Sequence, residues 1–125
     1  MVIETPSIQP EDSKRGQIWQ VNLDPTIGSE IKKKRRVLIV SANGLKSVEV
    51  KLAVPITDWK TWHEHVIWCV SIEPSIQNGL KKKSTADVLQ TRCLSTKRFL
   101  EYKGLVSAEL LEEIVAALAA IVEYV

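Results

Sequence analysis

Short apolar runs separated by turn signals make up the chain from Gly16 onward. The run QIWQVNL (17–23) alternates apolar and polar positions, which predicts a half-buried strand ending at Asp24-Pro25. The run RVLIVSA (36–42) is continuous and rich in β-branched residues, which predicts a strand buried on both faces. Asn43-Gly44 follows directly and predicts a tight turn into the next strand.

Three further segments predict strands in the middle of the chain. VEVKLAVPI (48–56) sets a row of apolar residues against polar ones, with Val48, Val50, Leu52 and Val54 opposed to Glu49 and Lys51. HVIWCVSIE (65–73) predicts a strand that ends at Pro74, and TADVLQTRCL (85–94) predicts one more. Five strands within about 80 residues, joined by short connections, indicate a small twisted barrel.

The C-terminal segment has a helical period instead. From Leu110 to Val122 the apolar residues recur every three or four positions, which predicts a helix over 107–123 that Ser107 can cap. Its wide apolar stripe fits packing on the barrel, on a second copy of the chain, or on both. A separate short helix is expected over Thr96–Glu101. Residues 1–14 are expected to be a flexible lead-in to a single domain of residues 15–125.

The distribution of charge adds a functional expectation. The chain carries 17 Lys and Arg against 15 Asp and Glu. Residues 14–106 hold all 17 basic residues and eight acidic ones, a balance of +9, whereas residues 1–13 carry −3 and residues 107–125 carry −4. This split suggests an anionic partner for the middle segment, nucleic acid first, although surface lysines also serve solubility.

The sequence also indicates the cellular compartment in which we expect the protein. The sequence has no apolar run long enough to cross a bilayer and no signal-peptide pattern at its start, so we expect a cytoplasmic protein without membrane contact. Cys69 and Cys93 are isolated within strand-like segments, which favours reduced, buried thiols.

Five consecutive basic residues, Lys32–Arg36, stand directly against the apolar run of the second predicted strand. A lysine run is typical of a solvated loop, but it can also attract phosphates without regard to sequence. An arginine at the start of a buried strand is held by the rigid sheet behind it, so Arg35 is suited to a fixed phosphate contact.

Three segments occur in order and carry a family resemblance: RGQIWQVNLDPTIGSE (15–30), RRVLIVS (35–41) with VPIT (54–57), and VLQTRCLSTKRFL (88–100). Together they resemble the MazF/PemK family of toxins from toxin–antitoxin pairs, over roughly residues 15 to 123. The resemblance implies a mainly β fold with a C-terminal α-helix, a small SH3-like barrel. It further implies a homodimer that cuts single-stranded RNA and needs no cofactor. The implied partners are a small acidic antitoxin and, through the antitoxin complex, operator DNA.

The resemblance also assigns site residues. The arginine that faces the scissile phosphate in the family corresponds to Arg35, and the threonine after the third strand corresponds to Thr57. Gln90 and Arg92 match a Gln-x-Arg motif that the family places on its fifth strand beside the site. With the basic run, the expected RNA-binding residues are Lys32, Lys33, Lys34, Arg36, Gln90 and Arg92.

The chemistry expected of this site needs no metal. The 2′-hydroxyl of RNA attacks the adjacent phosphorus and leaves a 2′,3′-cyclic phosphate, so the enzyme moves two protons and stabilises charge. Arg35 suits charge stabilisation, and Thr57 can orient the phosphate or the 2′-hydroxyl through its hydroxyl group. Glu30, the only acid of the GSE segment, is the candidate base. Alternatively, Thr57 ends a strand, and Arg92 pairs with Asp87 or Glu101.

Several positions depart from the family pattern. Arg36 stands where many relatives have proline, Lys32–Lys34 where many have Gly-rich residues, and Leu89 where many carry a carboxylate. The last change leaves open a catalytically weak or inactive nucleic-acid-binding module. A third alternative, a pure protein-interaction barrel, is disfavoured by the +9 balance of the middle segment.

The WHEHV segment is the remaining candidate for a site. His63 and His65 are expected to be exposed imidazoles in a loop, because no third metal ligand is near in sequence. Trp59 and Trp62 in the same loop could stack on bases, contact a partner or cover the barrel.

Overall fold

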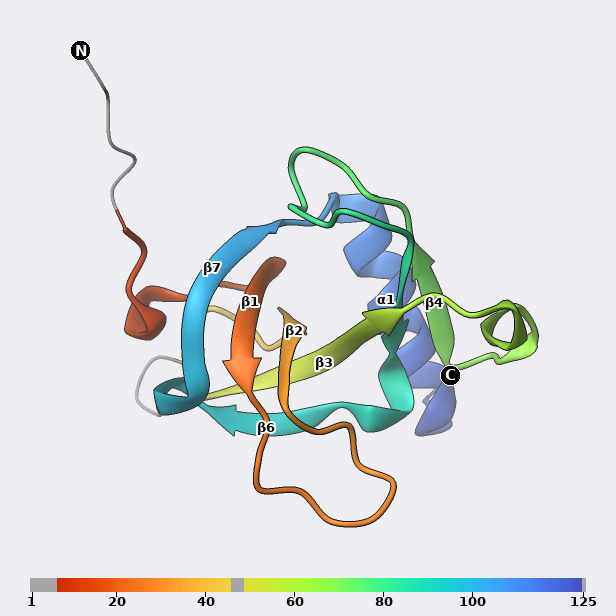
Figure 1. Ribbon diagram of the computed structural model, residues 1–125, viewed down its shortest axis with the longest axis horizontal. Helices are drawn as coiled ribbons and strands as arrows, with labels where there is room; N and C mark the ends of the chain where they lie inside the picture. Colours follow the sequence, from red (N-terminus) through yellow and green to blue (C-terminus); the bar gives the residue numbers. More distant parts are fainter. Residues whose placement is uncertain (1–6, 46–48, 125) are drawn as a thin grey trace.

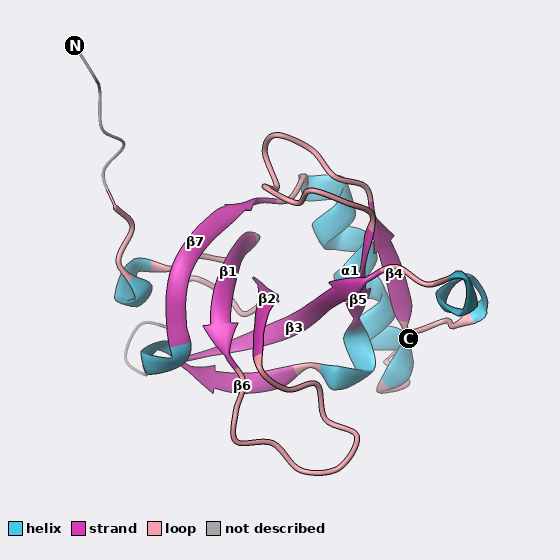
Figure 2. Ribbon diagram, viewed as in Figure 1, coloured by secondary structure: helices cyan, strands magenta, loops and turns pink. Residues whose placement is uncertain are grey.

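The computed structural model of the chain describes residues 7–45 and 49–124. Within these ranges the antiparallel strands are β1 (Gln17–Asn22), β2 (Lys34–Ile39), β3 (Val50–Asp58), β4 (Cys69–Ile72), β5 (Ser84–Asp87), β6 (Arg92–Ser95) and β7 (Phe99–Leu105). One α-helix, α1 (Ala108–Ile121), follows them. Four short 3₁₀ helices lie between strands or before them: η1 (Pro10–Asp12), η2 (Thr61–His65), η3 (Val88–Gln90) and η4 (Thr96–Arg98). The fold is thus mainly β with a C-terminal helix, as the sequence predicts (Figures 1 and 2).

The long strand β3 joins two parts of the sheet. The strands follow the order β4-β5-β3-β2-β1-β7, and β6 pairs with β3 outside this path. The first half of β3 pairs with β6 from Val50 to Ala53, and its second half pairs with β5 from Ile56 to Asp58. Figure 1 shows the strands curling around a common interior with α1 closing one side. Because β3 spans the whole barrel, its two ends reach opposite sides of the molecule.

Two cores lie on opposite faces of the central strands. The helix-side core includes Ile18, Leu38, Val54, Val88 and Ile114. The aromatic core includes Trp19, Val21, Val37, Leu94 and Phe99. Alternate residues of β1 and β2 therefore enter different cores, which confirms that the second strand is buried on both faces. The first strand is buried along the face of Gln17, Trp19 and Val21, but on its other face only Ile18 is buried. Gln20 and Asn22 are partly exposed, so the predicted half-buried strand is confirmed at these polar positions.

The alternation predicted for β3 holds only in part. Val54 is fully buried, but Val50 and Leu52 are 38% and 39% exposed, whereas Lys51 is only 9% exposed. The helix-side core ends before the first residues of β3, so Val50 and Leu52 lie outside it, whereas Lys51 shares its face with Ala53 of the aromatic core. Val48 lies outside the described residues.

Strand boundaries after residue 60 also differ from the prediction. HVIWCVSIE contains the last residue of η2 and a turn before the short strand β4, and TADVLQTRCL is two strands, β5 and β6, separated by η3. The expected helix over Thr96–Glu101 is one 3₁₀ turn, η4, followed by β7. Strand β7 is set by distant pairing with β1, in which Phe99 lies opposite Val21. A strand that is specified by distant pairing need not show a strand-like hydrophobic pattern in its own sequence.

The two ends of the domain pack on the barrel. The α1 helix confirms the expected C-terminal helix: Ser107 Oγ accepts from Leu110 N at 3.1 Å, and Leu111 and Ile114 are buried. The lead-in over 1–14 stays a prediction, although η1 forms and Ser13 is 3% exposed. Both cysteines are free, but Cys69 is only partly buried and Cys93 is exposed on β6, contrary to expectation. Across the described ranges, no helix is long and apolar enough to span a bilayer.

Candidate functional site

Arg35 and Thr57 border the same small pocket, of about 170 Å³, at the ends of β2 and β3. The sheet register explains this, because Arg36 pairs with Ile56 and the next step along both strands sets Arg35 against Thr57. The pocket is also lined by Gln20, Lys34, Arg36, Ile56, Asp58, Leu80 and Ser84. The structure therefore brings together the two residues that the sequence assigned to the scissile phosphate.

The pocket carries uncompensated positive charge. Lys34, Arg35 and Arg36 all border it, and none of them takes part in an ion pair within the described ranges. Arg36 Nε is buried and has no hydrogen-bond partner there. Guanidinium groups without carboxylate partners are suited to phosphate oxygens. The pocket therefore has the charge and the donors of an anion site.

Asp58 is the one acidic residue that borders this pocket in the described part of the chain. Its Oδ2 lies 2.9 Å from Lys82 Nζ. The hydrogen bond from Lys82, with smaller contributions from Lys60 and Arg35, lowers the pKa of Asp58 below its ordinary value. Asp58 is thus a carboxylate at neutral pH. The sequence analysis missed it, although it directly follows Thr57 in the VPITD segment.

Glu30, Gln90 and Arg92 form a second cluster that holds the β1–β2 loop (residues 23–33). Gln90 Oε1 accepts from Ile31 N and Gln90 Nε2 donates to Ser29 O, both at 3.3 Å. Arg92 Nη1 lies 3.9 Å from Glu30 Oε2, so the partner of Arg92 is neither Asp87 nor Glu101. Gln90 lies in η3 rather than on a strand, which corrects the predicted position. The contacts of Gln90 position the loop.

Glu30 does not lie where the expected general base should be. Its Oε1 accepts from Ile27 N at 2.8 Å, and the residue does not border the pocket of Arg35 and Thr57. Its cluster nevertheless lies on the same side of the sheet as Arg35, because Arg92 is directly opposite Ala53, which shares a face of β3 with Thr57. The two clusters therefore flank one face of the barrel.

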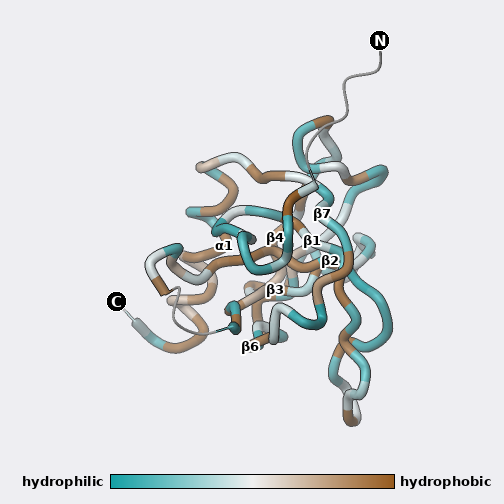
Figure 3. Tube along the Cα trace, turned by 90° about the vertical axis from the view of Figure 1, so that its left-hand side faces the viewer, coloured by the Kyte–Doolittle hydropathy of each residue, from teal (hydrophilic) through white to brown (hydrophobic). Residues whose placement is uncertain are grey.

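The β1–β2 loop is closed at its base and exposed at its tip. Leu23 N donates to Lys33 O at 2.9 Å, Lys33 N donates to Asp24 Oδ1 at 3.0 Å, and Arg98 Nη1 donates to Asp24 O at 2.7 Å. Lys32, Lys33 and Lys34 are all exposed. Figure 3 shows this loop projecting from the body of the molecule. Its lysines are thus free to meet a ligand that lies across the pocket.

Two partly buried ionisable groups, Asp87 and Cys69, lie next to η3. Burial raises the pKa of Asp87, and backbone hydrogen bonds from Gln90 and Leu89 partly offset this effect. Burial, with the nearby Asp87 charge, raises the pKa of the Cys69 thiol, so this thiol is unsuited to act as a nucleophile. Asp87 serves η3 and hence the placement of Gln90.

The WHEHV segment forms η2 beside the pocket. His63 is buried, with Nδ1 accepting from Lys60 N at 2.8 Å, so the expected exposed imidazole at this position is wrong. The reason is local, because the His63 ring packs between Trp62 at 3.9 Å and Trp59 at 5.6 Å between centroids. Lys83 Nζ lies 4.2 Å from the Trp59 ring centre, and Trp62 is 62% exposed. No group of three potential metal ligands occurs among the described residues.

Sequence comparisons identify known proteins to which this chain is similar. A sequence model of the family described as "PemK-like, MazF-like toxin of type II toxin-antitoxin system" matches residues 14–122. The chain is 32% identical over 113 residues to "Endoribonuclease MazF9" of Mycobacterium tuberculosis (strain ATCC 25618 / H37Rv), across 84% of this chain and 92% of that relative.

Solved structures show the same fold. MazF from Deinococcus radiodurans aligns with a TM-score of 0.75 at 19% identity, over 89% of this chain and 96% of that chain. An endoribonuclease in complex with its cognate antitoxin, from Mycobacterial species, aligns with a TM-score of 0.69 at 21% identity, over 89% and 95%. With the family model spanning residues 14–122, the chain belongs to the PemK-like, MazF-like toxins of type II toxin–antitoxin systems.

Proposed function

We propose that this chain is a metal-independent endoribonuclease that cleaves single-stranded RNA, and the toxin of its toxin–antitoxin pair. The proposal rests on the pocket that Arg35 and Thr57 both border. The basic side chains of this pocket, Lys34, Arg35 and Arg36, have no ion-pair partner among the described residues. A phosphodiester is the ligand whose charge and donor requirements suit this pocket. The relative named an endoribonuclease supports the same activity.

In the proposed reaction the 2′-hydroxyl attacks the adjacent phosphorus and the 5′-oxygen leaves, giving a 2′,3′-cyclic phosphate and a 5′-hydroxyl. Arg35 binds the non-bridging oxygens as negative charge grows on them, and the Thr57 hydroxyl orients the phosphate. A guanidinium stays protonated, so another group takes the proton of the 2′-hydroxyl. Water or the protonated form of that group gives a proton to the 5′-oxygen as it leaves.

Two carboxylates are candidates for that base. Glu30 is bound to Ile27 N and lies near Arg92, outside the pocket, whereas Asp58 borders the pocket directly. Asp58 is therefore the better placed group in this arrangement, and Glu30 reaches the phosphate only if the β1–β2 loop shifts. The carboxylate that many relatives carry at the position of Leu89 is absent here, and Leu89 is 58% exposed.

The RNA strand crosses the pocket along the basic surface. On one side the β1–β2 loop supplies Lys32, Lys33 and Lys34, which attract successive phosphates. On the other side Lys60 and Lys82 flank Asp58, and the exposed ring of Trp62 offers a stacking surface for a base. Gln90 and Arg92 contribute by holding the loop against η3.

The proposed assembly is a homodimer inhibited by a small acidic antitoxin, with operator DNA bound through that complex. The Mycobacterial relative was solved with its cognate antitoxin, and MazF of Deinococcus radiodurans was solved with MazE. On this chain, Val50 and Leu52 expose apolar surface along β3, which suits contact with a second copy.

A cleavage assay tests the function. The purified chain is incubated with a long single-stranded RNA in EDTA, and the ends are mapped. We expect discrete fragments with 2′,3′-cyclic phosphate ends, and no cleavage when every 2′-hydroxyl is replaced by hydrogen. RNA binding without cleavage would contradict the enzymatic proposal. It would favour the binding module that the exposed Leu89 leaves open.

A further inference from the structure

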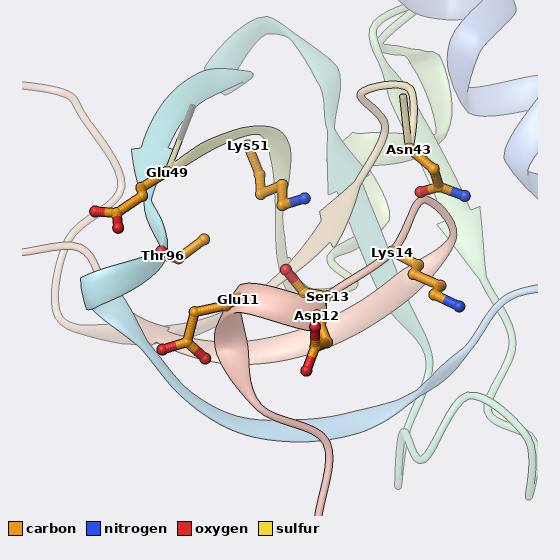
Figure 4. Close-up of a pocket in the computed structure, with 8 residues that line it drawn as sticks. All are labelled: Glu11, Asp12, Ser13, Lys14, Asn43, Glu49, Lys51 and Thr96. Carbon is orange, nitrogen blue, oxygen red and sulfur yellow. The ribbon is translucent and has the colours of Figure 1, made fainter. Parts of the chain in front are cut away.

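A second pocket, of about 510 Å³, lies at the other end of β3. It is enclosed by η1 and the residues after it, the turn at Asn43, the start of β3 and η4 (Figure 4). Lys51 and Thr57 are six residues apart on β3, which corresponds to about 20 Å of extended strand. The pocket is therefore separate from the one that Arg35 and Thr57 border.

Two polar side chains in this pocket are largely buried. Lys51 is 9% exposed and takes part in no ion pair within the described ranges. Ser13 is 3% exposed, and its Oγ has no hydrogen-bond partner there. Figure 4 shows the Lys51 side chain extending from β3 toward Ser13. Because a buried hydroxyl without a partner is costly and an ammonium without an ion-pair partner attracts an anion, this pair is suited to an anionic group supplied by a ligand.

The rim of the pocket has the opposite charge. Glu11, Asp12 and Glu49 are exposed, and none of them is ion-paired in the described part of the chain. Among the described residues that line the pocket, three carboxylates and the ammonium groups of Lys14 and Lys51 give a net charge of −1. A simple anion would be repelled by the rim, and a simple cation by Lys51. A ligand that carries one carboxylate and a cationic side chain satisfies both.

We propose that this pocket binds a small basic zwitterion, of the size and charge of a free arginine or lysine. The ligand carboxylate accepts from Lys51 Nζ and Ser13 Oγ, and the cationic end lies against Glu11, Asp12 and Glu49. The volume falls within the range of small-molecule sites. Residues 11–13 precede the span 14–122 that the family model matches, so the site depends on this chain's own N-terminal segment. The proposal is independent of RNA cleavage.

Isothermal titration of the full chain tests the proposal with three probes: L-arginine, agmatine and L-glutamate. Agmatine keeps the guanidinium but lacks the carboxylate, whereas glutamate keeps the carboxylate but lacks the cationic side chain. We expect arginine to bind at least tenfold more tightly than either, because each loses one charge-assisted set of hydrogen bonds. No binding of arginine at millimolar concentration, or equal binding of agmatine, would overturn the proposal.

Variants locate the site. Lys51→Met keeps the length of the side chain and removes its charge, so it should weaken arginine binding at least tenfold and leave agmatine binding unchanged. Ser13→Ala should weaken arginine binding by a smaller factor, and it serves if Lys51→Met does not fold. Lys97→Met, at an exposed lysine of η4 that does not line the pocket, is the matched control. Arginine binding unaffected in both test variants would place the ligand elsewhere and refute the assignment.

Discussion

Among single residues, Arg35 has a backbone that is held in place by its neighbours and a side chain that is exposed to solvent. Its neighbour Val37 is fully buried in the aromatic core, while Arg35 itself is exposed and borders the pocket. The backbone that carries the guanidinium is therefore fixed by packing, and the charge remains available to a ligand. This separation allows the charge of Arg35 to be removed without disturbing the fold.

Arg35→Ala should lower the cleavage rate by at least about a hundredfold, because a lost charged transition-state contact costs on the order of 3 kcal/mol. The melting temperature should stay close to that of the wild type. Single-turnover cleavage and thermal denaturation measure the two effects. Arg15→Ala, at an exposed arginine outside the pocket, is the control and should cut normally. A wild-type rate in Arg35→Ala would remove the residue from the mechanism.

Asp58→Asn should lower the rate by about a hundredfold or more at unchanged RNA affinity, as expected for loss of a general base. Glu30→Gln should have a much smaller effect, because Glu30 lies outside the pocket. The reverse ranking in single-turnover assays would make Glu30 the base.

The pH dependence of Asp58 gives an independent check. Its pKa is lowered from 3.8, mainly by Lys82, so the ion pair is fully present above this value and is lost as the pH falls through the lowered pKa. The Asp58-dependent rate should therefore not decline between pH 7 and about pH 5. In an NMR titration, Lys82→Met should move the pKa of Asp58 back toward 3.8. An unchanged pKa would mean that Lys82 does not set it.

At the element scale, the β1–β2 loop has two functions that different residues carry. Its exposed lysines face solvent, while Gln90 in η3 accepts from Ile31 N and donates to Ser29 O. Charge and position can therefore be altered separately.

Replacing Lys32, Lys33 and Lys34 with serine should weaken binding to all RNA sequences without changing the cut motif. Each lost phosphate contact should reduce the slope of log affinity against log salt by about 0.7. Fluorescence anisotropy at several salt concentrations measures this slope. An unchanged slope would mean that the lysine run is only a solvated loop.

Gln90→Ala should release the loop instead. Loss of both 3.3 Å hydrogen bonds should speed amide exchange in residues 27–33, and the salt slope of RNA binding should stay constant. Leu89→Ala, at the exposed neighbouring position, is the control for hydrogen exchange mass spectrometry. Unchanged exchange together with weaker RNA binding would show that Gln90 binds RNA directly.

At the scale of the whole molecule, the predicted homodimer depends on which surfaces remain apolar. Most apolar residues of α1 pack on the barrel of the same chain, with Leu111 8% exposed. Substitution of Leu111 by glutamate would therefore test folding more than assembly. The exposed row of β3, Val50 and Leu52, is the better probe of a second copy.

The wild type should have a mass of about twice the 14.1 kDa chain in light scattering at micromolar concentration. Leu52→Glu should give folded monomers, because the side chain is already partly exposed and its charge need not be buried in a single chain. Circular dichroism confirms that the variant is folded. A wild-type mass of one chain with full cutting activity would exclude both the dimer and a groove built by two subunits.

The elements whose cause is local could be predicted from the amino-acid sequence. Continuous β-branched residues made β2, a helical period with a capping serine made α1, and the segments around Arg35 and Thr57 carried the family resemblance. In each case the residues that specify the feature are neighbours in the chain, so the pattern is legible without the fold. The pairing of Arg35 with Thr57 follows from one hairpin and could also be expected.

Contacts between residues that are far apart in the chain depend on the folded arrangement instead. Four features depend on partners far away in sequence: the interruption of the predicted strand by η3, the strand β7, the burial of the Lys51 side chain, and the contact of Gln90 with the β1–β2 loop. Asp58 entered the site because β2, β3 and Lys82 converge there. Long-range strand pairing sets these contacts, and it is chosen by the packing of two whole cores. No short window of residues contains that information.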